Sequence, residues 1–202
     1  TMMESYEAMA DFERMMELTE QLISNAAMDS IGRYEVNISN DENNPQMISL
    51  KPPFARISMI DLVKNAIGED MHPSMDINKA RDIAKAHGVV PKDAWGAGKI
   101  IGEIYDEVAE RTLSEPTFVT EHPVEISPLA KVHRNDPYLT ERFELVVASR
   151  ELANAFSELN DPIDQRARFE AGQKAKDSGD DEATGVDEEY IRALEYALPP
   201  TG

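Results

Sequence analysis

Two glutamates, Glu144 and Glu151, are the side chains best placed to bind a metal ion. They flank a predicted turn, and antiparallel strands on either side of that turn would bring the two carboxylates close together. Carboxylates held close repel each other unless a cation, a proton or an arginine intervenes. Mg²⁺ suits such a pair, because it takes one or two carboxylates together with substrate phosphates. The alternative is two solvent-exposed glutamates beside Arg142 and Arg150.

Asn154, Phe156 and Glu158 form a second group, because strand side chains two residues apart share a face. Together they could bind an amino acid. The Asn amide would bind its carboxylate, the Phe ring would pack against its alkyl stem, and the Glu carboxylate would bind a cationic group. The stripe could equally be the polar face of an edge strand. Glu151 has the opposite parity, so it shares this face only if a β-bulge lies near residues 152–153.

Glu4 and Tyr6 are a third candidate pair, two residues apart on a predicted strand. A glutamate beside a tyrosine hydroxyl would make a pocket selective for a cation, because an ammonium group donates three hydrogen bonds and neither partner carries a competing positive charge. The pair on its own is weak support for a site. We therefore weigh it together with the two groups near residue 150.

Composition excludes several classes of function. The 202 residues include 39 acidic against 20 basic side chains, a net charge of −19 that disfavours a nucleic-acid groove or an anionic-lipid surface in this chain alone. Without cysteine, disulfides and thiolate metal sites are excluded. No apolar run approaches the roughly 20 residues that cross a bilayer, and we expect a cytoplasmic protein. The histidines lack metal-ligand spacing and are expected to be structural or exposed; they are His72, His87, His122 and His133.

The elements that must position these residues form an α+β arrangement, an antiparallel sheet flanked by helices. The first part of the chain predicts an amphipathic helix over residues 11–31 and a hairpin of residues 33–39 and 47–50 around a polar turn at 40–45. Three helices predicted within residues 58–115 could form a small subdomain, because proline-rich segments stand at both of its ends. Ser58 and Asp76 are its expected helix caps.

After residue 115, β character returns. We expect a strand at 117–120, further β structure around 124–127, and a second hairpin of residues 142–148 and 150–159. Asp161 followed by Pro162 predicts a helix start, and that helix should run to about residue 176. An acidic loop and a last helix over 187–198 follow.

Four stretches of the chain resemble the catalytic domain of bacterial-type class II lysyl-tRNA synthetases. They are TMMESYEAMADFERMMELTEQL, PTFVTEHPVEISPLAK, RFELVVASRELANAFSELNDPIDQRARFE and DEEYIRALEYALPPTG. They follow the order of the family, from the end of its motif 2 to just before its motif 3. The resemblance implies a catalytic core at residues 1–57 and 116–202, interrupted by a helical insertion at 58–115.

The resemblance also implies roles for the candidate residues. Glu144 and Glu151 match the acidic pair that holds Mg²⁺ and the phosphates of ATP, and Glu158 matches the residue that faces the ε-ammonium of the substrate lysine. The positions that match lysine-binding residues of the family are Glu4, Tyr6, Asn154, Phe156 and Glu158.

The implied function is that of a homodimeric lysine-tRNA ligase, which activates lysine with ATP to lysyl-adenylate and transfers it to tRNA(Lys). The chain begins in TMMESYEAMADF and stops at ALPPTG, so we expect a piece of such an enzyme. It lacks motif 1, the arginines of motifs 2 and 3, and the anticodon-binding domain, so the piece should be inactive alone. Two alternatives stay open: a paralogous ligase that lysylates elongation factor P, and a non-catalytic acidic interaction domain. The related aspartyl and asparaginyl enzymes are disfavoured, because Glu4, Tyr6 and Glu158 suit a cationic substrate.

Overall fold

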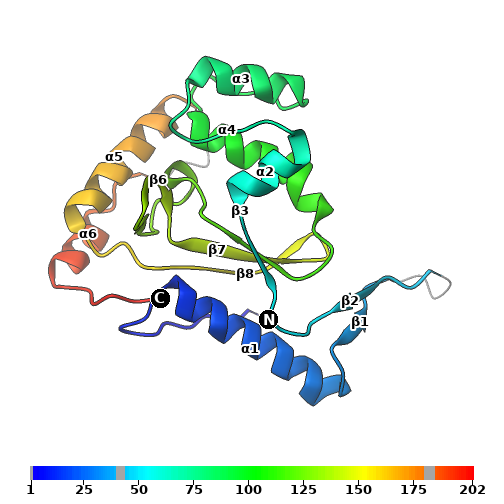
Figure 1. The fold of residues 1–202 in the computed structure, drawn as a ribbon. Coiled ribbons are helices and arrows are strands. Elements are labelled where there is room, and N and C mark those ends of the chain that lie inside the picture. Colours follow the sequence, from blue (N-terminus) through cyan, green and yellow to red (C-terminus); the bar gives the residue numbers. More distant parts are fainter. Residues whose placement is uncertain (1, 40–43, 180–184) are drawn as a thin grey trace.

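A computed structural model describes residues 2–39, 44–179 and 185–202 of the chain. Its centre is a four-stranded sheet in the order β3-β4-β7-β8, with helices on both faces (Figure 1). The strands are β3 (Ala55–Ser58), β4 (Thr117–Thr120), β7 (Arg142–Val147) and β8 (Arg150–Phe156).

One strand pair departs from the expected antiparallel sheet. β4 pairs with β7 and β7 with β8 in the antiparallel sense, but β3 pairs with β4 in parallel. No strand was predicted at residues 55–58, and its parallel pairing is the exception in a sheet whose other pairs are antiparallel, as expected. The chain leaves β3 through several helices before it returns as β4, and such a crossover brings two strands side by side in parallel.

The expected helices between β3 and β4 are confirmed. Ser58 and Asp76 cap two of them through their side-chain oxygens, and the third continues into a π-helical turn and a short 3-10 helix. Together they cover one face of the sheet and share a core with Val119 and Val146. The elements are α2 (Met59–Ile67), α3 (Ile77–Ala86), α4 (Ala97–Ile104), the π turn Tyr105–Ala109 and the 3-10 helix Glu110–Thr112. The division into core and insertion at 58–115 stays a prediction.

The other face of the sheet packs against α1 (Phe12–Ile31), which confirms the first expected helix. Asp11 caps it by accepting hydrogen bonds from two backbone N–H groups, and Gly32 ends it in a left-handed conformation. Strand residues of alternating parity therefore separate two cores: Phe143 and Leu145 pack toward α1 and Val146 toward the opposite helices.

Several smaller elements complete the described fold, and they change some expectations. The first hairpin is confirmed, although residues 40–43 of its expected turn lie outside the described residues, as do residues 180–184 of the expected acidic loop. Residues Val124–Ile126 form a 3-10 helix instead of β structure, and the last helix ends at Glu195. The elements are β1 (Glu35–Asn37), β2 (Met47–Ser49), β5 (Val132–His133) paired with β6 (Asp136–Thr140), α5 (Pro162–Asp177) and α6 (Glu188–Glu195). Within the described ranges, no helix has the length and apolar character needed to cross a membrane.

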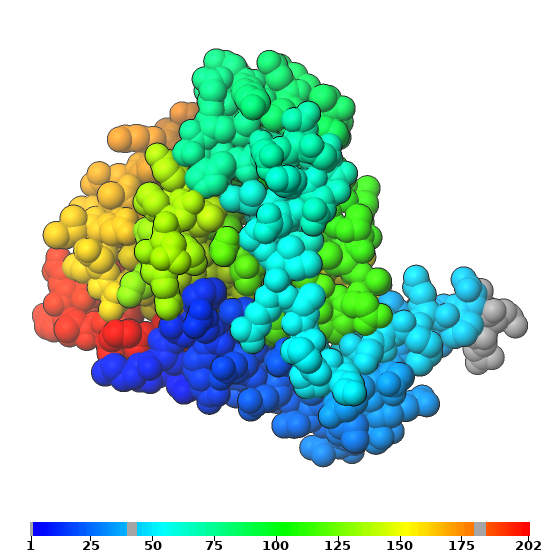
Figure 2. All heavy atoms as spheres, viewed as in Figure 1, coloured from blue at the N-terminus to red at the C-terminus, as the bar shows by residue number. Residues whose placement is uncertain are grey.

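The two ends of the chain lie together. Glu7 and Gly202 exchange two backbone hydrogen bonds of 2.9 and 3.2 Å, and Met9 N–H donates to the Pro200 carbonyl at 2.7 Å. Figure 2 shows the C-terminal residues (red) against the N-terminal segment (dark blue). This contact is an isolated bridge, and residues 2–6 are not part of a strand. The prediction of a strand under Glu4 and Tyr6 was wrong, because no neighbouring strand in the described chain pairs with them.

Candidate functional site

The β7–β8 pair contains the β-bulge that the sequence required. Leu145 pairs with Ala153, but the next residue of β7, Val146, pairs with Glu151. Leu152 is therefore the extra residue on β8, and its side chain is 57% exposed. The expectation of a bulge near residues 152–153 is confirmed.

This bulge places the polar candidates of the strand pair on one face. Glu144 lies opposite Asn154 and Arg142 lies opposite Phe156, and residues directly opposite each other project to the same side. Glu151 joins them, because its partner on β7 is two residues from Glu144. Without the extra residue, Glu151 would project toward α1.

Glu144 is a largely buried carboxylate with one arginine partner. Arg142 Nη2 donates to Glu144 Oε1 at 2.6 Å, and the two side chains are 15% and 16% exposed. Burial raises the pKa of Glu144 to about 7; Arg142 opposes this rise, while Glu151, Asp106 and Glu110 add to it. The face therefore holds more negative charge than its arginine neutralises.

The acidic face adjoins a polar cavity of about 170 Å³, whose lining includes Glu144, Arg142, Asp106 and His122. Asp106 comes from the π-helical turn, and burial, with Glu110 and Glu103, raises its pKa to about 6. No group of three or more acidic or histidine side chains in the described ranges is arranged as a complete metal site. Two carboxylates fit Mg²⁺ nonetheless, because that ion usually completes its shell with water and substrate phosphate oxygens.

Glu158 lies in a different place, at the end of β8 in a depression of about 670 Å³. Its carboxylate is partly buried and has no hydrogen-bond or ion-pair partner among the described residues. Burial raises the pKa of Glu158. A carboxylate in this state favours a ligand that brings a positive charge.

Tyr6 of the N-terminal segment lies close enough to Glu158 for the two side chains to interact electrostatically. The Tyr6 hydroxyl donates to Glu4 Oε1 at 2.7 Å. This hydrogen bond raises the pKa of Tyr6, and burial and the charge of Glu158 add to the rise. Burial and Glu158 likewise raise the pKa of Tyr190 in α6. The structure thus groups Glu158 with the N-terminal pair, and no direct bond joins this group to Glu144.

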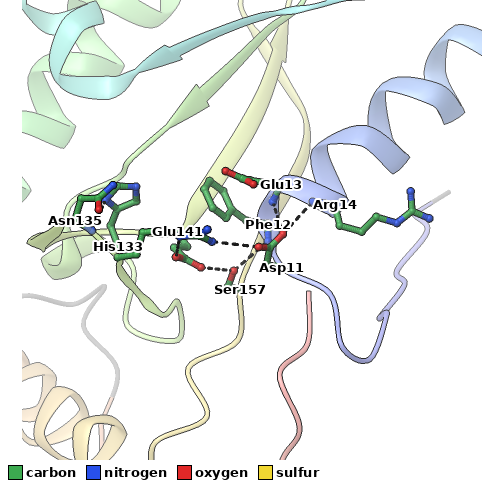
Figure 3. Close-up of polar contacts among 9 residues, drawn as sticks. Asp11, Phe12, Glu13, Arg14, His133, Asn135, Glu141 and Ser157 are labelled. Atoms are coloured by element: carbon green, nitrogen blue, oxygen red, sulfur yellow. Dashed lines mark hydrogen bonds and ion pairs between the residues drawn. The ribbon is translucent and has the colours of Figure 1, made fainter.

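A polar network anchors the strand end beside Glu158. Ser157 donates to Glu141 Oε2 at 2.7 Å and accepts from the backbone N–H of Phe12 at 3.0 Å. Arg134 bridges Glu141, at 2.8 Å, and Asp11, at 3.1 Å. Figure 3 shows Glu141 and Ser157 pointing toward the start of α1. The network therefore holds the end of β8 against the residues that follow Tyr6.

Sequence reasoning missed Glu141, and it treated Arg142 only as a neighbour of Glu144. One signal was present for Glu141, because it has the same parity as Phe143, which packs toward α1. A charge at an inward strand position needs a buried partner. Nothing in the sequence pointed to Arg134, which comes from the β5–β6 turn.

The comparison with known families decides the lineage of this site. The family described as tRNA synthetases class II (D, K and N) matches residues 1–202. The chain belongs to this family. Proteins named Lysine--tRNA ligase from Bacillus subtilis (strain 168) and Enterococcus faecalis (strain ATCC 700802 / V583) are each 48% identical to it over 202 residues, and one from Lactococcus lactis subsp. cremoris (strain MG1363) is 49% identical over 203. The synthetase chain is covered completely in each match and spans 40% of each relative's length.

Proposed function

We propose that this synthetase chain is the lysine-binding and metal-binding part of the catalytic domain of a lysine-tRNA ligase. The full-length enzyme would activate lysine with ATP to lysyl-adenylate and transfer the lysyl group to tRNA(Lys), as a homodimer in the cytoplasm. The names of the relatives support this proposal. The observation that carries it is the carboxylate of Glu158, which has no partner within the described part of the chain.

This observation discriminates among the substrates that the family description abbreviates as D, K and N. An ammonium group carries a positive charge and only donates hydrogen bonds. It would therefore compensate the charge of Glu158, and Glu4 and Tyr6 could accept its hydrogen bonds. The carboxylate of aspartate would be repelled by Glu158 and Glu4, and the amide of asparagine would leave the charge uncompensated. Lysine fits best.

The strand pair supplies the other half of the chemistry. In the proposed first step a carboxylate oxygen of lysine attacks the α-phosphorus of ATP, and the bond to the pyrophosphate oxygen breaks. Glu144 and Glu151 would hold Mg²⁺, which neutralises phosphate charge as pyrophosphate leaves. Asn154 and Phe156 would orient the lysine carboxylate and pack along its alkyl stem.

Lysine-dependent exchange of pyrophosphate into ATP by the full-length enzyme tests the proposal. We expect exchange with lysine and none with aspartate or asparagine. Exchange with aspartate, or none with any amino acid, would contradict the proposal, and the latter would favour the non-catalytic alternative. The 202-residue chain alone should show no exchange. Transfer to tRNA(Lys) rather than to elongation factor P separates the two lysyl ligases.

A further inference from the structure

Arg142 connects the two groups of site residues on the strand pair. Its side chain is 15% exposed and uses all three guanidinium nitrogens. Nη2 donates to Glu144 at 2.6 Å, Nε donates to Asn154 Oδ1 at 3.2 Å, and Nη1 donates to the Ile126 carbonyl at 2.7 Å and to Ser127 Oγ at 3.0 Å. One side chain therefore touches both a metal candidate and an amino-acid candidate.

The contact with Arg142 fixes which end of the Asn154 amide is free. A guanidinium group has only donors, so the amide must turn its oxygen toward Nε. The NH₂ end of Asn154 then has no partner among the described residues and projects on the ligand face. Any group that binds there must accept hydrogen bonds, as a carboxylate does and an ammonium does not.

The contact with the loop after β4 ties this arrangement to the helices. Arg142 binds Ile126 and Ser127, and the neighbouring Glu125 accepts a hydrogen bond from the backbone N–H of Lys99 in α4 at 2.9 Å. A carboxylate at the first turn of a helix is stabilised by the helix dipole. The loop of residues 125–127 is therefore held by Arg142 on one side and by the start of α4 on the other.

We propose that Arg142 is a positioning residue for the whole strand-pair site. It sets the carboxylate of Glu144 for the metal and makes Asn154 a pure donor for the carboxylate of the amino acid. This inference rests on the proposed function. The role requires a planar guanidinium group that donates hydrogen bonds in three directions. Lysine keeps the charge but cannot make this set of bonds.

Arg142→Lys in the full-length enzyme tests the inference, with Arg168→Lys as the matched control. Arg168 is also largely buried, and it donates to the carbonyls of Ser127 and Ala130, so it holds the same loop without touching the site. Mn²⁺ binding is measured by electron paramagnetic resonance and lysine binding by calorimetry. We expect Arg142→Lys to weaken each by about tenfold, the effect of losing one charged hydrogen bond, and Arg168→Lys to leave both within about twofold.

A second variant tests the polarity of Asn154 directly. Asn154→Asp keeps an oxygen for Arg142 but offers the ligand only acceptors. The variant should lose affinity for lysine and lose less for lysinamide, whose amide can donate. We expect the ratio of lysine to lysinamide affinity to fall by about tenfold, with Mn²⁺ binding kept, because one charged hydrogen bond becomes a repulsion.

The outcomes separate the inference from the proposed function. Wild-type affinities in Arg142→Lys, or the same losses in Arg168→Lys, would overturn the positioning role. An unchanged lysine to lysinamide ratio in Asn154→Asp would overturn the donor assignment. A wild-type enzyme that binds Mn²⁺ but no lysine would overturn the proposed function and the Asn154 part with it, while the manganese measurement still decides the Glu144 part.

Discussion

The strand pair β7–β8 and the N-terminal wall, by which we mean Glu4, Tyr6 and the neighbouring Glu158, form their parts of the site in different ways. On the strand pair, backbone register and a bulge set the side chains, and Arg142 compensates part of the charge of Glu144. At the wall, Tyr6 comes from a segment without regular structure and is 67% exposed, and Glu158 has no hydrogen-bond or ion-pair partner among the described residues. The strand pair is therefore organised before ligand binding, whereas the wall has an acidic side chain whose charge a cationic ligand can compensate.

The largest effect should follow from removing the acidic pair of the strand region. The double variant Glu144→Gln and Glu151→Gln in the full-length enzyme should lower pyrophosphate exchange by about 10³-fold, because a metal supplies several kcal/mol of charge stabilisation. Lysine affinity in the absence of ATP should change little. Near wild-type exchange at saturating Mg²⁺ would show that the pair is not the metal site.

A smaller effect, on the free energy of unfolding, is expected from His122, which lines the cavity beside the strand pair. His122 is 1% exposed, its Nε2 donates to the Val119 carbonyl at 3.1 Å, and burial, helped by Arg142, lowers its pKa to about 3. Between pH 6.5 and 3 the unfolded chain binds a proton at this residue and the folded chain does not, so stability falls as the pH falls. From pH 7 to 4.5 this group should cost about 2–3 kcal/mol of unfolding free energy.

Urea unfolding of the chain at the two pH values measures this effect. His122→Gln keeps a donor for the Val119 carbonyl and should lose less stability on acidification than the wild type. His87→Gln, at the end of α3, is the control and should keep the acid sensitivity of the wild type. Equal acid sensitivity in all three proteins would show that His122 does not stay neutral in the fold.

The smallest effect is expected from the Tyr6 hydroxyl of the N-terminal wall. Tyr6→Phe removes one exposed hydroxyl, so the KM for lysine should rise about 3- to 10-fold, the value of one neutral hydrogen bond. The KM for ATP should stay the same. A larger change in the KM for ATP than in the KM for lysine would place Tyr6 outside the lysine pocket. The strand pair and the N-terminal wall would then not differ in the ligand that they bind.

Local signals were sufficient for much of the fold. Helix caps such as Ser58, Asp76 and Asp161 were predicted from side chains that accept backbone hydrogen bonds, and the structure confirms them. The bulge at Leu152 followed from strand parity and from the demand that Glu151 share a face with its neighbours. These features depend on a few adjacent residues.

What escaped prediction depends on contacts between distant residues. β3 has four residues and is a strand only because β4, about sixty residues later, lies beside it. Likewise, the roles of Arg142 and Arg134 depend on which residues fold next to them. Candidate residues could be grouped by their chemistry from the sequence. Only the structure shows that Glu158 lacks a partner among the described residues.

Glu158→Gln in the full-length enzyme tests the central claim most directly, that the uncompensated carboxylate selects the ammonium of lysine. Calorimetry with lysine and, separately, with ATP gives both dissociation constants. We expect the Kd for lysine to rise about 10- to 100-fold, because a charged hydrogen bond is lost, and the Kd for ATP to stay within about twofold of the wild type. An equal loss of affinity for both ligands would contradict the assignment of Glu158 to the lysine pocket.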